Sequence, residues 1–432
     1  MRVIYIHGII ILLLIFILSG HRTYSQNNDS IKDAVVTKNC EQQDIKDLFR
    51  KNDKPLKPPK KTMVLVLPNV GSNPANGFLL GVGGAVGWYW GPKETTRVSS
   101  AGFSAAFTTK NQFLIFSKSN VYTTDDKFFL QGDWRYYIYK APTWGLGTNA
   151  PDTTFETTTW SWQGADLEET EGAYPLSYDY IKLHEVVNYK ILEYLYAGLG
   201  YHLDYYNNIS DQLLELDTLP LQLTPHYLYS EFKNFSTTKY MLSGLSLNAV
   251  YDSRDNLMNP YKGYYANINY RYNPIFIGSD QNSSSLWLEF RTYVPLSKKT
   301  PRHLIAFWAF GNFLLTGNQP YLTLMAIGED QKARSGRAYV AGRYRGEDFV
   351  YGEVEYRFPI SQCSKILGGV LFVNATSASN RTAGVDLFSY VRPGVGFGFR
   401  FMINKHFRTN INFDIGFGYR SEGFYFSGTE TF

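Results

Sequence analysis

Residues 349–360 alternate between apolar and charged side chains, and this alternation limits the chain to few folds. Val350 and Val354 fall on one face of an extended strand, whereas Glu353 and Glu355 fall on the other. A period of two with one apolar face predicts a half-buried strand. The core of a sandwich could not hold these carboxylates unpaired, but a barrel wall with lipid outside and a polar, water-accessible lumen can hold them.

The first 25 residues have the features of a secretory signal peptide. Arg2 gives a positive start, residues 9–18 form an apolar core, and small residues precede Gln26. This core is too short to cross a bilayer as a helix, which needs about 20 residues. We therefore expect residues 1–25 to direct export and then to be removed.

The composition of the exported part favours an outer-membrane barrel. The chain contains 34 Tyr, 30 Phe and 37 Gly, and no apolar run after the signal peptide is long enough for a spanning helix. A secreted β-sandwich or propeller is the alternative class, but no repeat of about 40 residues marks propeller blades. The mature chain is nearly neutral, which gives no reason to expect a nucleic-acid partner.

Sixteen strand candidates follow a polar, Lys- and Pro-rich segment at 26–61, which predicts a disordered periplasmic linker. The predicted fold over 62–432 is all-β, a transmembrane antiparallel β-barrel of 16 strands. Its long connections all join an odd strand to the next even one, as in outer-membrane barrels with long external loops, and an even strand number places both termini in the periplasm. The long connections lie near 141–177, 207–236, 317–348 and 377–387. The strand candidates lie near 62–68, 77–90, 96–107, 111–122, 128–140, 178–190, 192–206, 237–251, 262–274, 284–296, 303–316, 349–360, 366–376, 388–402, 407–419 and 422–432.

Four stretches, in this order along the chain, carry a family resemblance. They are LPNVGSNPANGFLLGVGG from Leu67, YDSRDNLMNPYKGYY at 251–265, GRYRGED at 342–348 and a C-terminal stretch of alternating Gly and Phe that ends at Phe432. Together they resemble the bacterial surface antigen barrels, the family of BamA and TamA, over residues 62–432. The resemblance implies an integral protein of the bacterial outer membrane, with Phe432 as its C-terminal strand signal. It also implies outer-membrane lipid, assembly-complex subunits and client outer-membrane proteins as partners.

The resemblance further implies that the loop at 317–348 folds into the lumen, where an arginine of the family motif contacts an acidic group on the wall. Arg345 is the matching residue, and the motif around it comprises Arg343, Tyr344 and Gly346. Its expected partners are Asn374, Asp414 and the pair Glu353 and Glu355, all on predicted inward faces. The alternative is that Arg345 is one of several lumen arginines in a paired network.

The largest departure from the family lies before the barrel. BamA and TamA carry periplasmic POTRA repeats there, whereas residues 26–61 are too short and polar to encode one. We therefore expect a member without POTRA repeats, which puts stand-alone reception of substrate from the periplasm in doubt.

Two function hypotheses follow. The first is assembly of outer-membrane proteins within a complex, with strand pairing across a weak seam because the first strand candidate ends at Pro68. The alternative is a passive channel or export pore plugged by residues 317–348.

The reactive side chains predict no enzyme, no metal site and no cofactor. The seven His are scattered, and only His184 and His202 lie on adjacent strand candidates. No His, Cys or carboxylate spacing matches a metal site. Cys40 and Cys363 both face an oxidising compartment. A disulfide between them is therefore one alternative, but two free thiols are the favoured expectation.

Overall fold

The computed structural model describes residues 42–48, 62–73, 77–150, 173–217, 219, 221–298, 300–330, 334–361, 364–405, 408–427 and 430–432. The chain divides into two units, residues 1–40 and 41–432, and every described residue belongs to the second. The predicted signal peptide and both cysteines therefore lie outside the described residues, as does most of the predicted linker.

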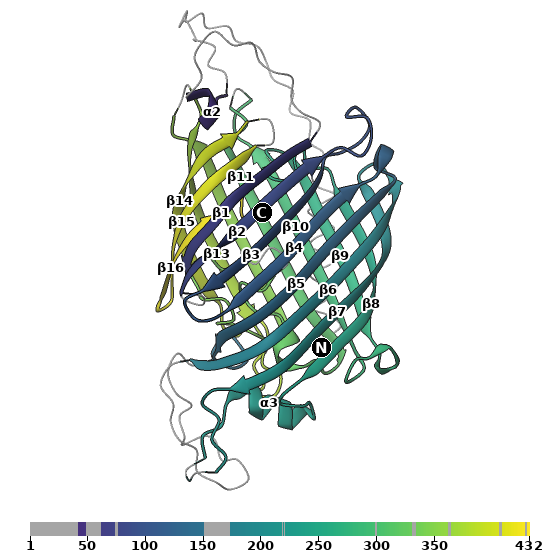
Figure 1. Cartoon of the computed structure of the whole chain (residues 1–432), viewed down its shortest axis with the longest axis vertical. Coiled ribbons are helices and arrows are strands. Elements are labelled where there is room, and N and C mark those ends of the chain that lie inside the picture. Colours follow the sequence, from purple (N-terminus) through teal and green to yellow (C-terminus); the bar gives the residue numbers. More distant parts are fainter. Residues whose placement is uncertain are drawn as a thin grey trace, which may run out of the picture. The chain divides into compact units, whose positions relative to one another are not determined.

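One antiparallel sheet of 16 strands follows the order of the sequence and curls into a barrel (Figure 1). Each predicted strand is present, with ends that move by a few residues. The strands are β1 (Thr62–Asn73), β2 (Gly77–Trp88), β3 (Ser99–Thr108), β4 (Phe113–Tyr122), β5 (Phe128–Thr143), β6 (Tyr174–Leu192), β7 (Leu195–Asp211), β8 (Tyr240–Asp252), β9 (Gly263–Asn273), β10 (Ser283–Pro295), β11 (Leu304–Gly317), β12 (Asp348–Pro359), β13 (Leu367–Ala378), β14 (Arg392–Asn404), β15 (Thr409–Gly418) and β16 (Ser421–Ser427).

The alternation in β12 gives the wall its two faces. Glu353 and Glu355 are buried toward the lumen, while Val354 and Tyr356 are exposed on the outer surface. This pattern confirms the predicted assignment of the two faces. Outward apolar side chains and inward charged ones are the arrangement that a lipid-embedded barrel requires.

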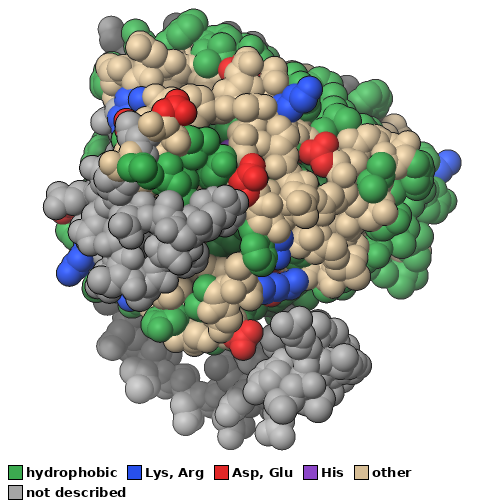
Figure 2. Space-filling view, turned by 90° about the horizontal axis from the view of Figure 1, so that it is seen from below, with side chains coloured by type: hydrophobic (Ala, Val, Ile, Leu, Met, Phe, Trp, Pro, Cys, Tyr) green, Lys and Arg blue, Asp and Glu red, His purple; other side chains and the backbone are tan. Residues whose placement is uncertain are grey.

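The long connections gather at one end of the barrel, here called the α3 end after the helix α3 (Pro225–Lys233). This helix begins where the Thr224 hydroxyl accepts a hydrogen bond from the backbone N–H of Tyr227 at 3.2 Å, and it ends at Asn234, whose φ is 57°. Seen from this end, the described surface carries scattered charged side chains among hydrophobic side chains and other uncharged groups (Figure 2). The opposite end carries the short helix α2 (Ile45–Leu48).

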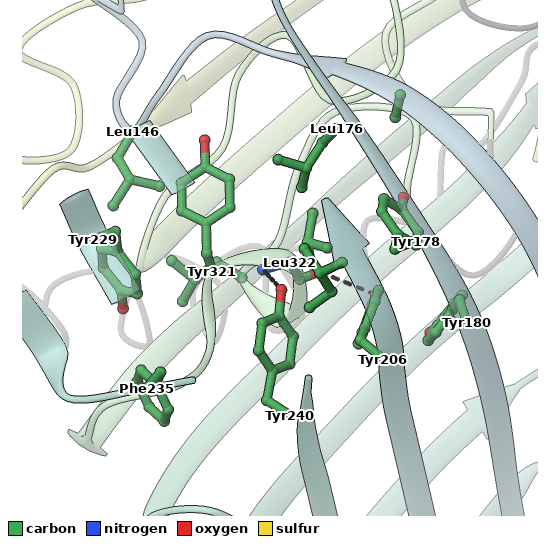
Figure 3. Packing of buried hydrophobic residues seen from close by; sticks show 13 residues of the cluster. Leu146, Leu176, Tyr178, Tyr180, Tyr206, Tyr229, Phe235, Tyr240, Tyr321 and Leu322 are labelled. Carbon is green, nitrogen blue, oxygen red and sulfur yellow. Dashed lines mark hydrogen bonds between the residues drawn. The ribbon is translucent and has the colours of Figure 1, made fainter. Parts of the chain in front are cut away.

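The α3 end of the lumen is filled by a cluster of tyrosines and leucines (Figure 3). The cluster surrounds the short 3-10 turn η4 (Tyr321–Thr323), which lies near the start of the connection from β11 to β12. The hydroxyl of Tyr206 donates to the carbonyl oxygen of Leu322 at 3.1 Å, and the hydroxyl of Tyr240 accepts from its N–H at 3.0 Å. This end of the barrel is therefore packed with side chains from both the wall and the connections.

Two of the strand ends that differ from the prediction lie at the seam between the first and last strands. β1 continues past Pro68, which pairs with Val82, and runs to Asn73. Proline is tolerated there because β1 is the first strand of the sheet. β16 instead stops at Ser427, five residues before the predicted end, and Phe432 lies buried inside the barrel (Figure 1). The short partner at the seam is thus the last strand and not the first.

Candidate functional site in the lumen

The connection between β11 and β12 folds back into the barrel. Tyr321, Ala326 and Ala338 in this loop are fully buried. Its backbone lies directly against β15, because a side chain on Gly416 would overlap the carbonyl oxygen of Arg337. The loop is thus placed in the lumen, as the resemblance implied.

Arg337 joins this loop to the barrel wall. Its Nη1 donates to Oδ2 of Asp414 on β15 at 2.7 Å, and its Nη2 donates to Oε1 of Glu353 on β12 at 2.6 Å and also to Glu355. The guanidinium also lies 3.8 Å from the centre of the Phe372 ring. One arginine thus binds three carboxylates from two strands, and charge-assisted hydrogen bonds of this kind are the strong ones.

Arg345 occupies a different place from the one predicted. Its Nη2 donates to Glu329 at 2.6 Å and its Nη1 to the carbonyl oxygen of Leu324 at 2.7 Å, both within the same loop. Its backbone pairs with Leu146 and Ala326, which holds it to connections at the α3 end. The pairing of Arg345 with Asp414, Asn374, Glu353 or Glu355 was therefore wrong, because the loop presents Arg337 to the wall and Arg345 to itself.

The other motif residues also lie away from the wall carboxylates. Arg343 donates to the carbonyl oxygen of Ala150 at 2.9 Å, and its guanidinium lies over Trp144. The Tyr344 side chain is fully buried against Tyr339. Gly346 lies so close to Ser379 that a Cβ would be 2.5 Å from its carbonyl oxygen. The GRYRGED stretch therefore packs among the connections at the α3 end of the barrel.

The predicted wall residues do come together, around Arg337. Asn374 donates to Oε2 of Glu353 at 3.3 Å, and the hydroxyl of Tyr351 donates to the same oxygen at 2.5 Å. Strict alternation along β12, β13 and β15 places all of these side chains inward. The carboxylates expected to bind Arg345 bind Arg337 instead, and Asn374, expected to accept from Arg345, donates to Glu353.

The ionic contacts extend from Arg337 to the last residues of the chain. Arg400 on β14 donates to Asp414 at 2.6 Å and to Glu430 at 2.8 Å. Arg357 donates to Oε2 of Glu355 at 2.5 Å and to the carbonyl oxygen of Phe432 at 3.2 Å. The ring of Phe432 packs against Trp308 and Tyr293. The loop and the segment 430–432, here called the tail, therefore share the same group of wall residues.

Sequence reasoning missed Arg337 and Glu430 as site residues. Arg337 stands in Gly-Arg-Ala-Tyr, where the positive φ of Gly336, 72°, turns the chain toward the wall. Arg337 is followed by Ala338, whereas Arg345 is followed by Gly346 as in the family motif, so the resemblance pointed to Arg345. Glu430 carried no sequence signal, because the predicted last strand continued to Phe432.

A turn in the loop is fixed by Asp330. Its carboxylate accepts hydrogen bonds from the backbone N–H groups of Arg334 at 3.0 Å and Ser335 at 2.8 Å. Burial alone would raise the pKa of Asp330, but the bonds from Ser335, with those from Arg334 and the charge of Lys118, hold this pKa below its usual value. The carboxylate thus stays charged, in the form that these bonds stabilise.

The turn after β8 contains another buried ion pair. Asp252 is fully buried and accepts from Arg254 at 2.8 and 2.9 Å, while Arg97 lies 3.6 Å away. The Arg254 guanidinium also stacks on Tyr265. These contacts fix the turn of the YDSRDNLMNPYKGYY stretch.

Neither a metal cluster nor a spanning helix is found in the described part of the chain. Its His, Cys, Asp and Glu side chains form no group of three that could hold a metal ion. Within the same residues, no helix is long and apolar enough to cross a membrane.

Residues 100–432 match the family model for the Omp85 superfamily domain. The chain belongs to the Omp85 superfamily. This barrel of the bacterial outer membrane is similar in fold to BamA from Haemophilus ducreyi lacking POTRA domains 1–3, with 15% identity, a TM-score of 0.51, and coverage of 86% of this chain and 71% of the other. No curated protein sequence matches it.

CdiB from Escherichia coli is a second solved structure with a similar fold to this Omp85 barrel. The identity is 9% and the TM-score 0.51 over 85% of this chain. The matched part covers 63% of the CdiB chain. At these identities the likeness concerns the fold.

Proposed function

We propose that this Omp85 barrel helps other outer-membrane proteins, or lipids, to enter the outer membrane as one subunit of a larger complex. The observation that carries the proposal is the unequal pair of strands at the seam. β1 has 12 residues and β16 has seven, and the last described pair of β15 with β16 joins Asn412 to Ser427. Among the described residues, the ladder between β15 and β16 runs from the pair Gly418 and Ser421 to the pair Asn412 and Ser427.

An unpaired strand edge can template an incoming strand. β1 and β16 lie next to each other (Figure 1), and among the described residues no backbone ladder joins them. The proposed clients are outer-membrane proteins, and the proposed partners are periplasmic or membrane subunits of an assembly complex. Both termini are proposed to face the periplasm.

Affinity purification of the tagged protein from outer membranes tests the proposal. Co-purified assembly factors, together with lower levels of other outer-membrane proteins after depletion of this protein, are the expected results. Isolation of the barrel alone, with unchanged outer-membrane protein levels after depletion, would contradict it.

The second candidate function is a channel or export pore plugged by the loop. The lumen beside the loop holds a cavity of about 630 Å³, which favours this alternative. Conductance in planar bilayers separates the two functions. A large pore that opens or widens on deletion of residues 330–348 would favour the plugged channel, whereas a barrel that does not conduct with or without these residues would favour the assembly function.

A further inference from the structure

One side of the cavity in the lumen carries a row of uncharged polar side chains. The row, here called the amide row, runs across four consecutive strands and consists of Asn248 on β8, Asn269 on β9, Trp287 on β10 and Asn312 on β11. Asn248 lies directly opposite Asn269, and Trp287 lies directly opposite both Asn269 and Asn312. Since neighbouring strands are about 4.8 Å apart, the row extends about 15 Å across the wall.

Much of the hydrogen-bonding capacity on this side is not used by the protein. Within the row, Asn269 donates to Asn248, but the side chains of Trp287 and Asn312 make no hydrogen bond to any described residue. Asn267 also lines the cavity, and its Oδ1 is buried without a partner among the described residues. Buried polar groups are normally hydrogen-bonded, so these groups require water or a ligand.

The charged side chains that line the same cavity bind one another instead. Arg135 donates to Asp133 at 2.7 and 2.8 Å, and Arg271 donates to Asp204 at 2.7 Å. Arg337 is held by the wall carboxylates described above. A charged ligand would therefore compete with existing ion pairs, whereas an uncharged ligand meets neutral groups that have no protein partner.

Trp287 adds a flat apolar surface to the amide row. Its ring stacks on Phe310, with the ring centroids 4.8 Å apart and an angle of 19° between the planes. The side chain is only half-buried, so part of the indole faces the cavity. An indole offers an apolar face and one N–H donor, and an amide both donates and accepts. A hydrocarbon chain in this place would leave the amides unpaired.

We propose that the amide row binds an uncharged oligosaccharide. Sugar hydroxyls both donate and accept hydrogen bonds, as the amides do, and the C–H face of a sugar ring packs on an indole. A cavity of about 630 Å³ lies in the range of small-molecule sites, and the row is roughly as long as a short oligosaccharide. This inference goes beyond the proposed assembly function, and it holds whether the barrel assembles proteins or conducts.

Binding to the purified, full-length protein tests the proposal, in a polyoxyethylene detergent that carries no sugar. Calorimetry measures a panel of uncharged trisaccharides, built from glucose, mannose, galactose or N-acetylglucosamine, and a neutral peptide of glycine and serine for comparison. The variants are Asn267→Ala and Asn312→Ala, and the matched control is Asn207→Ala on β7, which does not line the cavity. Heat-modifiable migration on gels confirms that each barrel is folded, and each variant can serve without the other.

The wild type is expected to bind at least one trisaccharide. Each cavity variant should bind it about fivefold more weakly, because a neutral hydrogen bond is lost, and the control should bind like the wild type. Weaker binding by either cavity variant supports the site. Absence of binding to every trisaccharide, equal binding by the wild type and both cavity variants, or binding of the peptide alone would overturn the proposal.

Discussion

Buried charges inside a barrel stabilise one another as a group, so the residue with the most partners contributes most to holding the loop against the wall. Arg337 binds Glu353, Glu355 and Asp414 at once. Arg400 and Arg357 each reach one of these carboxylates as well, so removal of Arg337 leaves Glu353 as the acid without an arginine. Breaking such a buried pair costs about 3–5 kcal/mol in a dry interior, and less in a lumen that contains water.

Arg337→Ala should leave a folded barrel whose loop is cut faster by protease from the α3 end. Arg337→Lys should restore only part of the protection, because lysine lacks the planar paired donors. Lys140→Ala, which removes an exposed cation, is the control. Equal cleavage of Arg337→Ala and the wild type would show that these contacts do not hold the loop.

Alternation along a strand is a local property, so the inward positions of Glu353, Glu355 and Asp414 could be predicted. Which loop arginine meets them depends on the path of the chain between Gly336 and Gly342, and that path is set by tertiary contacts. Arg337 and Arg345 are eight positions apart, and the glycine that follows Arg345 pointed to the wrong one. The acids of the site were therefore predictable and the arginine was not.

Among the strands, β15 sets how closely the β11–β12 loop can approach the barrel wall. Gly416 faces the Arg337 carbonyl and Gly418 faces the Tyr339 ring, and a Cβ at either would overlap them. By contrast, a Cβ on the inward Gly102 of β3 would meet its nearest atom, the carbonyl oxygen of Gly84, at 3.7 Å. Glycine is thus required on β15 by contact with the loop and not by the strand itself.

Gly416→Ala should push the loop away from β15 and raise its cleavage rate, because the carbonyl oxygen it meets belongs to backbone. Gly102→Ala, where there is room for a methyl group, should behave like the wild type in the same proteolysis assay. If both variants are protected equally well, the loop is able to shift without leaving the wall.

The tail depends on Glu430, which binds Arg400 and Asn410. Glu430→Gln removes the charge while keeping the shape, so the tail should leave the lumen more often. Thr431→Cys, in a background with Cys40→Ser and Cys363→Ser, reports this as faster labelling by a maleimide. The control is Glu422→Gln, because Glu422 is exposed on β16. If labelling proceeds at the same rate with and without the Glu430→Gln substitution, contacts other than the Glu430 carboxylate, such as the packing of Phe432, hold the tail.

For the whole molecule, the number and order of strands were predictable because each strand repeats the same two-residue pattern. Their ends were less certain, and β16 shows why. The sequence prediction carried this strand to Phe432, but ionic and aromatic contacts with distant strands hold residues 430–432 in the lumen. Such contacts have no signature in neighbouring residues.

The orientation of the barrel gives a further prediction. If the long connections face outward, protease added to intact cells should cut within 141–177 or 207–236 and spare 252–261. The α3 end, where the long connections gather, would then be the external end. Cleavage only after the periplasm is opened would reverse the orientation.

The meeting of Arg337 with acids from two strands also has a consequence for sequence divergence. Its partners stand 16, 18 and 77 positions further along the chain. A neutral residue at 337 would leave acids buried together, and neutral residues at the acid positions would leave the arginine buried alone. Substitutions at 337, 353, 355 and 414 are therefore expected to covary among related sequences, so that each lineage keeps the charges together or loses them together.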